Sequence, residues 1–351
     1  MIGWSGGWIR VSWTFLNPFH NTGNVLTEFS LEFPRAYGAV TAAAIFRAQP
    51  EDFQVDEELG YVPSGLGEHV FLHIVKRGEN TAWVAGKIAE LANVNVTDVG
   101  YCGRKDRHAV TAQWFSVYLP KAPEPDWTLL NTESIQLLSV SRHQTKLRRG
   151  EHRQNNFVIR LRDVQTADRN LLQQKIDTVF AQGVPNYFGE QRFGLGGNNL
   201  REAEAILEGG KRYRDKQKRG LMLSAARSYL FNQVLAVRVL AKNWASIIDG
   251  EINSQASGPL WGRGRPLVSG ALLELEQNAL ANWAAWCDGL EHAGLSQERR
   301  ALQLIPRNAR WSWVDNDLVL HFSLDAGEFA TAILHELAQL QNQSMEVSDP
   351  A

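Results

Sequence analysis

The pattern of polar and apolar residues changes twice along this chain, near Gly183 and again near residue 302. Before the first change, short alternating runs typical of β-strands occur together with stretches of helical period. Between the two changes the apolar residues mostly follow the helical period, as at 199–208 and 221–240. A strand-like run returns at 318–322. This order predicts a mixed α/β (α+β) domain that is interrupted by an inserted, mostly helical second domain.

The two changes also give domain limits. We place the first domain at 27–182 and 302–351, and the insertion at 183–301. A chain of 351 residues is long enough for two domains at the usual size of roughly 150 residues each. Residues 1–26 contain several tryptophans among glycines and follow neither period, so we expect a poorly ordered N-terminal extension.

Three helices can be placed from their caps and apolar stripes. Asn80 and Asp168 are suitable N-caps for the first two, and the third follows Asp325-Ala326-Gly327. The expected stripes are Val84, Ile88 and Leu91 in the first helix, Leu172, Ile176, Val179 and Phe180 in the second, and Phe329, Ile333, Leu337 and Leu340 in the third. Strands are expected at 43–47, 53–57, 70–75 and 156–162.

Composition excludes several classes of protein. A net charge of −2 with 44% apolar residues is typical of a globular chain and not of a basic nucleic-acid coat protein. No apolar run approaches the roughly 18 residues of a membrane span, so we expect no membrane partner. Cys102 and Cys287 match neither a disulfide framework nor a zinc pattern and suggest a reducing compartment. We expect a cytoplasmic protein and take it to be a monomer.

Two short segments are strongly basic although the whole chain is not. Residues 141–162 hold seven cations and one acid, a net charge of +6, and residues 211–219 hold six cations and one acid, a net charge of +5. Such runs are usually solvated faces, but two runs with so large an excess of positive charge favour a partner with a phosphate backbone. The nearby aromatic residues could stack on unpaired bases, although such side chains are more often core; they are Tyr187, Phe188, Phe193 and Tyr213.

One carboxylate, Asp106, lies among Arg104, Lys105, Arg107 and His108. Nearby positive charge favours the ionised form of a carboxylate, and the same cluster attracts a polyanion. Strand-like residues on both sides place Asp106 in a loop held by a sheet, a common position for a catalytic residue. This combination indicates an enzyme that works on nucleic acid; the alternative is a turn with solvated charges.

The sequence contains no motif for a cofactor or a metal ion. The glycines at 194–197 fit neither the GxGxxG fingerprint nor a P-loop. The nine histidines are scattered, with no HExxH motif and no close grouping with carboxylates. Ser224 and Ser228 lie in a helical pattern without a nucleophile elbow. We therefore expect no cofactor and no metal.

Residues 103–111, Gly-Arg-Lys-Asp-Arg-His-Ala-Val-Thr, resemble the catalytic signature G-x-K-D-[KR]-H-A-x-T of the TruD family of tRNA pseudouridine synthases. Residues 186–194 resemble the family block N-Y-F-G-x-Q-R-F-G. Four further blocks fit in the family's order, at 50–53, 155–157, 224–228 and 327–331, so that the resemblance covers about 27–340. It implies a pseudouridine-synthase catalytic domain with a family-specific insertion. It also implies tRNA as the substrate, with uridine isomerised to pseudouridine, expected at tRNA position 13, without cofactor or metal.

The resemblance also implies roles for single residues. Asp106 matches the essential aspartate, and Arg47 matches the basic position expected to pair with it. On periodicity alone Phe329 would be a core residue, Asn155 a cap or turn residue and Arg47 a surface charge. The predicted substrate-binding residues are Phe53, Asn155, Phe157, Phe329 and Lys105, with Phe157 where other pseudouridine synthases keep a tyrosine.

A single carboxylate is compatible with this chemistry. The reaction breaks a C–N glycosidic bond, turns the uracil and rejoins it through carbon, whereas a glycosidase usually needs two carboxylates. Asp106 could attack the sugar C1′ or remove the C2′ proton to give a glycal, and the sequence leaves both routes open. Extruding the base costs a few kcal/mol, which phosphate contacts of the basic runs would offset. An RNA-binding or RNA-remodelling protein without chemistry, and a base-excising hydrolase, stay open as alternatives.

Overall fold

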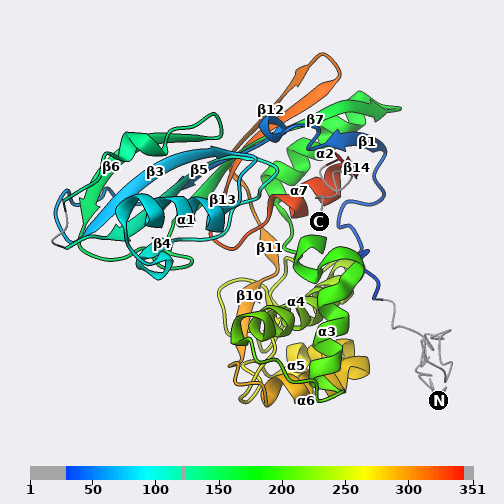
Figure 1. The fold of residues 1–351 in the computed structure, drawn as a ribbon. Coiled ribbons are helices and arrows are strands. Elements are labelled where there is room, and N and C mark those ends of the chain that lie inside the picture. Colours follow the sequence, from blue (N-terminus) through cyan, green and yellow to red (C-terminus); the bar gives the residue numbers. More distant parts are fainter. Residues whose placement is uncertain (1–28, 121–122, 344–351) are drawn as a thin grey trace, which may run out of the picture.

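A ten-stranded mixed sheet forms the framework of the computed structural model, which describes residues 29–120 and 123–343 (Figure 1). The predicted extension at 1–26 lies outside these residues. The strands of the sheet are β1 (Ala42–Phe46), β2 (Phe53–Glu58), β3 (His69–Arg77), β4 (Val99–Tyr101), β5 (Val110–Tyr118), β6 (Ile135–His143), β7 (Gln154–Thr166), β12 (Arg307–Val314), β13 (Asp317–Asp325) and β14 (Gln339–Asn342). The central order is β12-β13-β7-β2-β5-β3-β6, with β1, β4 and β14 at its margins.

The pairing of β2 with β5 is the feature of this sheet that matters for the site. The two strands are parallel and pair only from Gln54 with Val110 to Asp56 with Ala112. The next residues along them, Glu57 and Gln113, form hydrogen bonds outside this ladder. The ladder between β2 and β5 therefore ends there, and the Trp114 N–H of β5 donates instead to the Glu57 carboxylate of β2.

Helices α1 (Thr81–Ala92), α2 (Arg169–Gln182) and α7 (Ala330–Leu337) pack against the sheet and bury its apolar side chains. The predicted cap of α1 is confirmed, because the Asn80 side chain accepts a hydrogen bond from the Ala82 backbone N–H at 2.8 Å. The predicted cap of α2 is confirmed in the same way, with Asp168 accepting from the Leu171 N–H at 3.0 Å.

The prediction for the third helix is partly wrong. Helix α7 ends at Leu337, and Leu340 lies in β14, where it pairs in parallel with Ala44 of β1. Phe329 is the N-cap residue of α7 and not part of its stripe. Since the pairing that extends residues 339–342 comes from a strand about 300 positions away, local periodicity carries no signal for it.

The segment between the two changes in sequence pattern forms a second apolar core around α4 (Lys216–Leu240). Its other elements are α3 (Asn198–Leu207), α5 (Gly270–Ala279), α6 (Ala284–Glu291), β9 (Ser257–Leu260) and β10 (Glu298–Ala301). In Figure 1 these helices lie together beside the sheet. The chain leaves and re-enters the sheet part through β8 (Val184–Pro185) and β11 (Gln303–Leu304), which pair with each other. Residues 29–36 also pack on this helical part.

Three of the aromatic residues considered as base-stacking platforms are core residues instead. Tyr187, Phe188 and Phe193 are buried in the core around α4, and Phe193 is completely inaccessible. Tyr213 is partly exposed. The alternative reading of these rings as packing residues is therefore correct for the first three.

None of the helices in the described parts of the chain combines the length and the apolar character that crossing a bilayer requires.

Candidate active site

Asp106 lies where the sheet part and the helical part meet, and its carboxylate is held from three directions. The Arg47 Nη2 atom lies 2.6 Å from Asp106 Oδ2. The backbone N–H of His108 donates to Asp106 Oδ1 at 3.1 Å. From the helical part, Gln191 Nε2 approaches Asp106 Oδ2 at 3.5 Å. The Asp106 side chain is 16% exposed, so it is shielded and still reachable.

Arg47 is buried and follows β1 directly. Its backbone has φ 57°, a left-handed conformation that a non-glycine residue rarely adopts and that often marks a functional position. Burial lowers the pKa of Arg47, and the charge of Asp106 partly offsets that shift. The alternative reading of Arg47 as a surface charge does not fit this burial.

Phe53 and Phe157 form the apolar side of this group. The Arg47 guanidinium carbon lies 4.3 Å from the centre of the Phe53 ring, a cation–π distance. The rings of Phe53 and Phe157 are 5.9 Å apart and meet edge to face, and both are buried. The guanidinium therefore connects the Asp106 carboxylate to an aromatic wall.

A set of buried polar side chains fixes the loop that carries Asp106. Gln113 Nε2 donates to the carbonyl of Gly103, and the backbone N–H of Lys105 donates to Thr81 Oγ1 at 2.9 Å. Lys76 Nζ donates to the carbonyl of Asp106 itself at 2.8 Å. Lys76, Thr81 and Gln113 are each at most 1% exposed. Because buried donors and acceptors are costly to leave unpaired, this arrangement strongly restrains the loop.

Lys105 points into the protein and not toward solvent. Its Nζ lies 2.6 Å from Glu57 Oε2 and 2.5 Å from Asn155 Oδ1, and its side chain is 8% exposed. Asn155 in turn pairs with His152 Nε2 at 3.0 Å. Asn155 and Lys105 are thus adjacent and linked to the Asp106 loop. Glu57, which Lys105 contacts, is the first residue of β2 past the ladder with β5.

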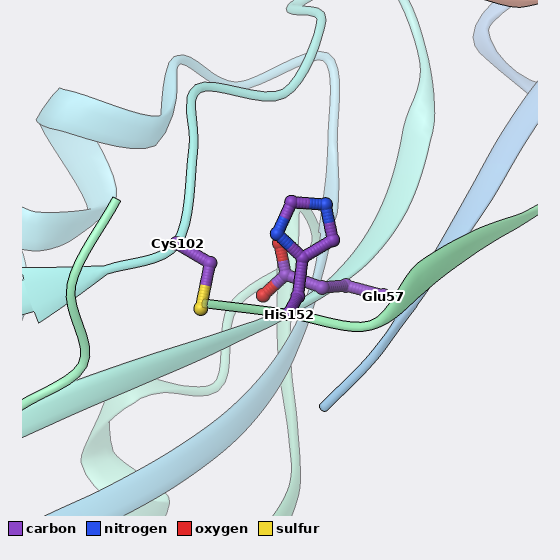
Figure 2. A group of neighbouring side chains, drawn as sticks. All are labelled: Glu57, Cys102 and His152. Carbon is purple, nitrogen blue, oxygen red and sulfur yellow. The ribbon is translucent and has the colours of Figure 1, made fainter. Parts of the chain in front are cut away.

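Glu57, Cys102 and His152 form a close grouping that no sequence motif indicates (Figure 2). All three are buried, and one potential ligand atom of each lies within 4.8 Å of the others. Burial raises the pKa of the Cys102 thiol to about 12 and lowers that of His152, so these two groups are neutral near pH 7. The Lys105 ammonium already compensates Glu57. A soft divalent ion could bind here only by displacing Lys105 and removing the thiol proton.

Phe329 contacts a different set of side chains. Its ring centre is 5.8 Å from that of Phe188, and the Arg300 guanidinium carbon lies 5.9 Å from the Phe329 ring and 4.3 Å from the Phe188 ring. Phe329 is half-buried, on the side of the helical part. The structure therefore brings together Asp106, Arg47, Phe53, Phe157, Lys105 and Asn155, with Phe329 across the junction between the two parts.

Comparison with known proteins shows which family this chain belongs to. Residues 38–213 match the family model of tRNA pseudouridine synthase D (TruD). A protein from Cellvibrio japonicus (strain Ueda107) named tRNA pseudouridine synthase D is 57% identical over 328 residues, covering 92% of this chain and 98% of the relative. The chain belongs to the TruD family. An Aeromonas hydrophila subsp. hydrophila protein of the same name is 46% identical over an alignment that covers 87% of this chain and 93% of that protein.

A solved structure supports the same fold for this TruD-family chain. A crystal structure assigned to tRNA pseudouridine synthase D (TruD) of Methanosarcina mazei superposes with a TM-score of 0.64 at 17% identity, covering 87% of this chain and 95% of its own. The expected pseudouridine-synthase fold is thus confirmed.

In this TruD-family chain, the basic residues of 141–162 are less available to a partner than their number suggests. Most of the arginines in this run are bound to acids: Arg142 to Glu124, Arg153 to Glu58, Arg160 to Asp317, and Arg162 to Asp52. A count of charges along the sequence cannot reveal this, because Glu58, Asp317 and Asp52 lie far from the run in the sequence. In the second run, Lys211 is bound to Glu202, whereas Arg212 and Arg214 are exposed.

Proposed function

We propose that this chain is a tRNA pseudouridine synthase in which Asp106 acts alone as nucleophile or base on the target uridine, expected at tRNA position 13. The observation that carries the proposal is the 2.6 Å pair of Arg47 and Asp106 beside the ring of Phe53. A carboxylate in this setting has a fixed direction, and the adjacent aromatic wall offers an apolar surface to an extruded uracil.

The proposed chemistry uses only groups of this chain and of the RNA. The Asp106 carboxylate either attacks C1′, with the uracil leaving as an anion, or removes the C2′ proton so that a glycal forms. In both routes the uracil must stay bound and turn so that C5 bonds to C1′. In the first route this bond replaces the ester bond between Asp106 and C1′, and in the second Asp106 returns its proton to C2′. The C5 proton is then lost to water and N1 takes up a proton, which completes the isomerisation. Arg47 orients the carboxylate, and Asn155 and Phe329 are proposed to contact the base or its sugar. The proposal requires no cofactor and no metal.

Lys105 was predicted from the resemblance to bind substrate. Its Nζ is engaged by Glu57 and Asn155, so we propose that it orients Asn155 and does not bind the RNA directly. We also propose that the protein acts as a monomer in the cytoplasm, the compartment that holds its tRNA substrate.

The test is a single-turnover reaction on an unmodified tRNA transcript, followed by nucleoside analysis. The wild-type protein should convert one uridine to pseudouridine, and Asp106→Asn should give no product while binding tRNA within a few fold. An RNA-binding protein without chemistry would give no product with either protein. A hydrolase would release free uracil. Turnover by Asp106→Asn would contradict the proposed role of this residue.

A further inference from the structure

Lys76 is a fully buried lysine that contacts the backbone of the proposed catalytic residue. It lies near the end of β3, between Thr111 of β5 and Ile135 of β6, and has no exposed surface. Its Nζ donates to the carbonyl of Asp106 and to the carbonyl of Glu79, each at 2.8 Å. In the described part of the chain no carboxylate lies within ion-pair distance of this ammonium.

Such a group is expensive to bury. An ammonium that leaves water for a site without a paired acid loses hydration that two carbonyl oxygens restore only in part. A methionine of similar volume would fill the same space without this cost. A lysine at this buried position therefore calls for a role, and its contact with the Asp106 peptide suggests one.

We infer that Lys76 is a positioning residue for the proposed isomerisation: its ammonium holds the Asp106 peptide carbonyl and thereby sets where the carboxylate meets the ribose. The inference rests on the proposed function. Arg47 and the His108 N–H hold the carboxylate end of the same residue. Lys76 holds the main-chain end, so the Asp106 side chain is fixed at both ends.

The charges around Lys76 make this role dependent on pH. Burial lowers the pKa of Lys76 to about 8. Asp106 in the loop and Glu79 after β3 oppose the shift, and Lys105 adds to it. The neighbours on the flanking strands, Thr111 and Ile135, carry no charge. Deprotonation of Lys76 weakens the hydrogen bonds that it donates, because a neutral amine is a weaker donor than an ammonium. It also takes away a positive charge next to Asp106. The rate should therefore fall as the pH rises above about 8.

Stability should change in the opposite direction. The pKa of Lys76 is about 8 in the folded chain, against 10.5 for an ordinary lysine side chain, so between these values the unfolded chain binds more protons. The Lys76 contribution to the free energy of unfolding consequently rises with pH in this window. A fall in rate over the same window is then not the result of unfolding at this site.

The experiment measures single-turnover pseudouridine formation from pH 6.5 to 9.5 in wild type, Lys76→Arg and Lys76→Met, with Lys87→Met as control because Lys87 is an exposed lysine of α1. Ionisation of the RNA affects the reactions of all four proteins equally, so differences between their pH profiles come from the protein. We expect a roughly tenfold loss of wild-type rate per pH unit above about 8. In Lys76→Arg this loss should be absent, because a guanidinium stays charged over the whole range. Lys76→Met should be slower by at least tenfold at pH 7, with unchanged tRNA binding.

The inference is overturned if wild type and Lys76→Arg have the same pH profile, or if Lys76→Met matches wild type at every pH. It is also overturned if the wild-type rate does not fall by pH 9.5, an outcome that needs no variant to fold. Pseudouridine formed by the wild type in any of these cases leaves the proposed function intact. Its failure to appear at any pH removes the proposed function itself.

Discussion

Arg47 combines three features that rarely occur together in one residue. It is buried, its backbone is left-handed, and its guanidinium contacts both the Asp106 carboxylate and the face of Phe53. A backbone conformation of this kind costs of order 1–3 kcal/mol, which the surrounding contacts must offset. The cost is understandable if the conformation is what brings the guanidinium to Asp106.

Replacing Arg47 by Met should therefore damage the reaction more than the binding of tRNA. Removing one partner of a buried ion pair typically costs about 3–5 kcal/mol. If even half of this appears in the barrier, the single-turnover rate falls by at least about tenfold. Arg47→Lys keeps the charge but loses the planar stack on Phe53, so its rate should be intermediate. Equal rates for wild type and Arg47→Met would contradict a role for this pair in the reaction.

The junction between α1 and the Asp106 loop works as one element. Thr81, the first residue of α1, accepts a hydrogen bond from the Lys105 N–H and donates to Gln113 Oε1 at 3.1 Å. Asn80, one residue earlier, caps the helix but faces solvent. Neighbouring residues thus have separate tasks: Asn80 stabilises the helix, and Thr81 connects it to the loop.

Thr81→Val should lower both stability and rate, because it leaves the Lys105 N–H and the Gln113 side chain without their partner. The expected loss is about 1–3 kcal/mol in the free energy of unfolding. Asn80→Ala is the matched control and should cost about 1 kcal/mol without changing the rate of folded protein. Thr81→Ser should restore most of the rate. Urea unfolding and single-turnover kinetics measure the two effects, and equal rates for Thr81→Val and Asn80→Ala would refute this division of tasks.

For single elements, the sequence predicted the structure where the interacting residues are close together in the chain. Asn80 and Asp168 were identified as caps because a cap and its helix are adjacent. Glu57, Lys76 and Gln113 were not identified as site residues, since each occurs in an ordinary strand. Their polar side chains are unusual only because the strands bury them. Asp106 was indicated by the basic residues around it, but its pairing with Arg47 was predicted from family motifs alone, because neither composition nor period pairs residues 59 positions apart.

At the scale of the whole molecule, the exposed basic side chains outside ion pairs are distributed differently from the basic residues counted along the sequence. Ion pairs with Glu124, Glu58, Asp317 and Asp52 occupy four of the seven basic side chains of 141–162. The arginines of the second run that remain exposed, Arg212 and Arg214, precede α4 in the helical part. The second run is therefore the better candidate for phosphate contacts.

Replacing Arg212 and Arg214 together by Gln should weaken tRNA binding and flatten its dependence on salt. Each lost phosphate contact is expected to reduce the slope of log K against log salt by roughly 0.7–0.9. Arg169→Gln with Arg310→Gln is a control of equal charge change, placed at α2 and β12 of the sheet part. A slope that stays the same in the first pair, or changes equally in both pairs, would exclude Arg212 and Arg214 from the interface.

The contact between residues 33–35 and α7 should make the stability of the molecule sensitive to acid. Burial, with smaller effects of Arg35 and Lys175, lowers the pKa of His335 to about 4. Below the ordinary value of 6.5 the unfolded chain binds the proton first, so stability is full above pH 6.5 and is lost as the pH falls toward 4. The loss at this site is up to about 3 kcal/mol. His335→Gln should flatten this dependence in urea unfolding, whereas the exposed His292→Gln should not.

The most direct test of the central claim, that Asp106 isomerises a uridine in tRNA, is a map of pseudouridine in cellular RNA. Cells without this protein should lack pseudouridine at one tRNA site, expected at position 13. Wild-type protein should restore the modification, and Asp106→Asn, produced at the same level, should not. An unchanged pseudouridine map in cells without the protein, or full restoration by Asp106→Asn, would contradict the account.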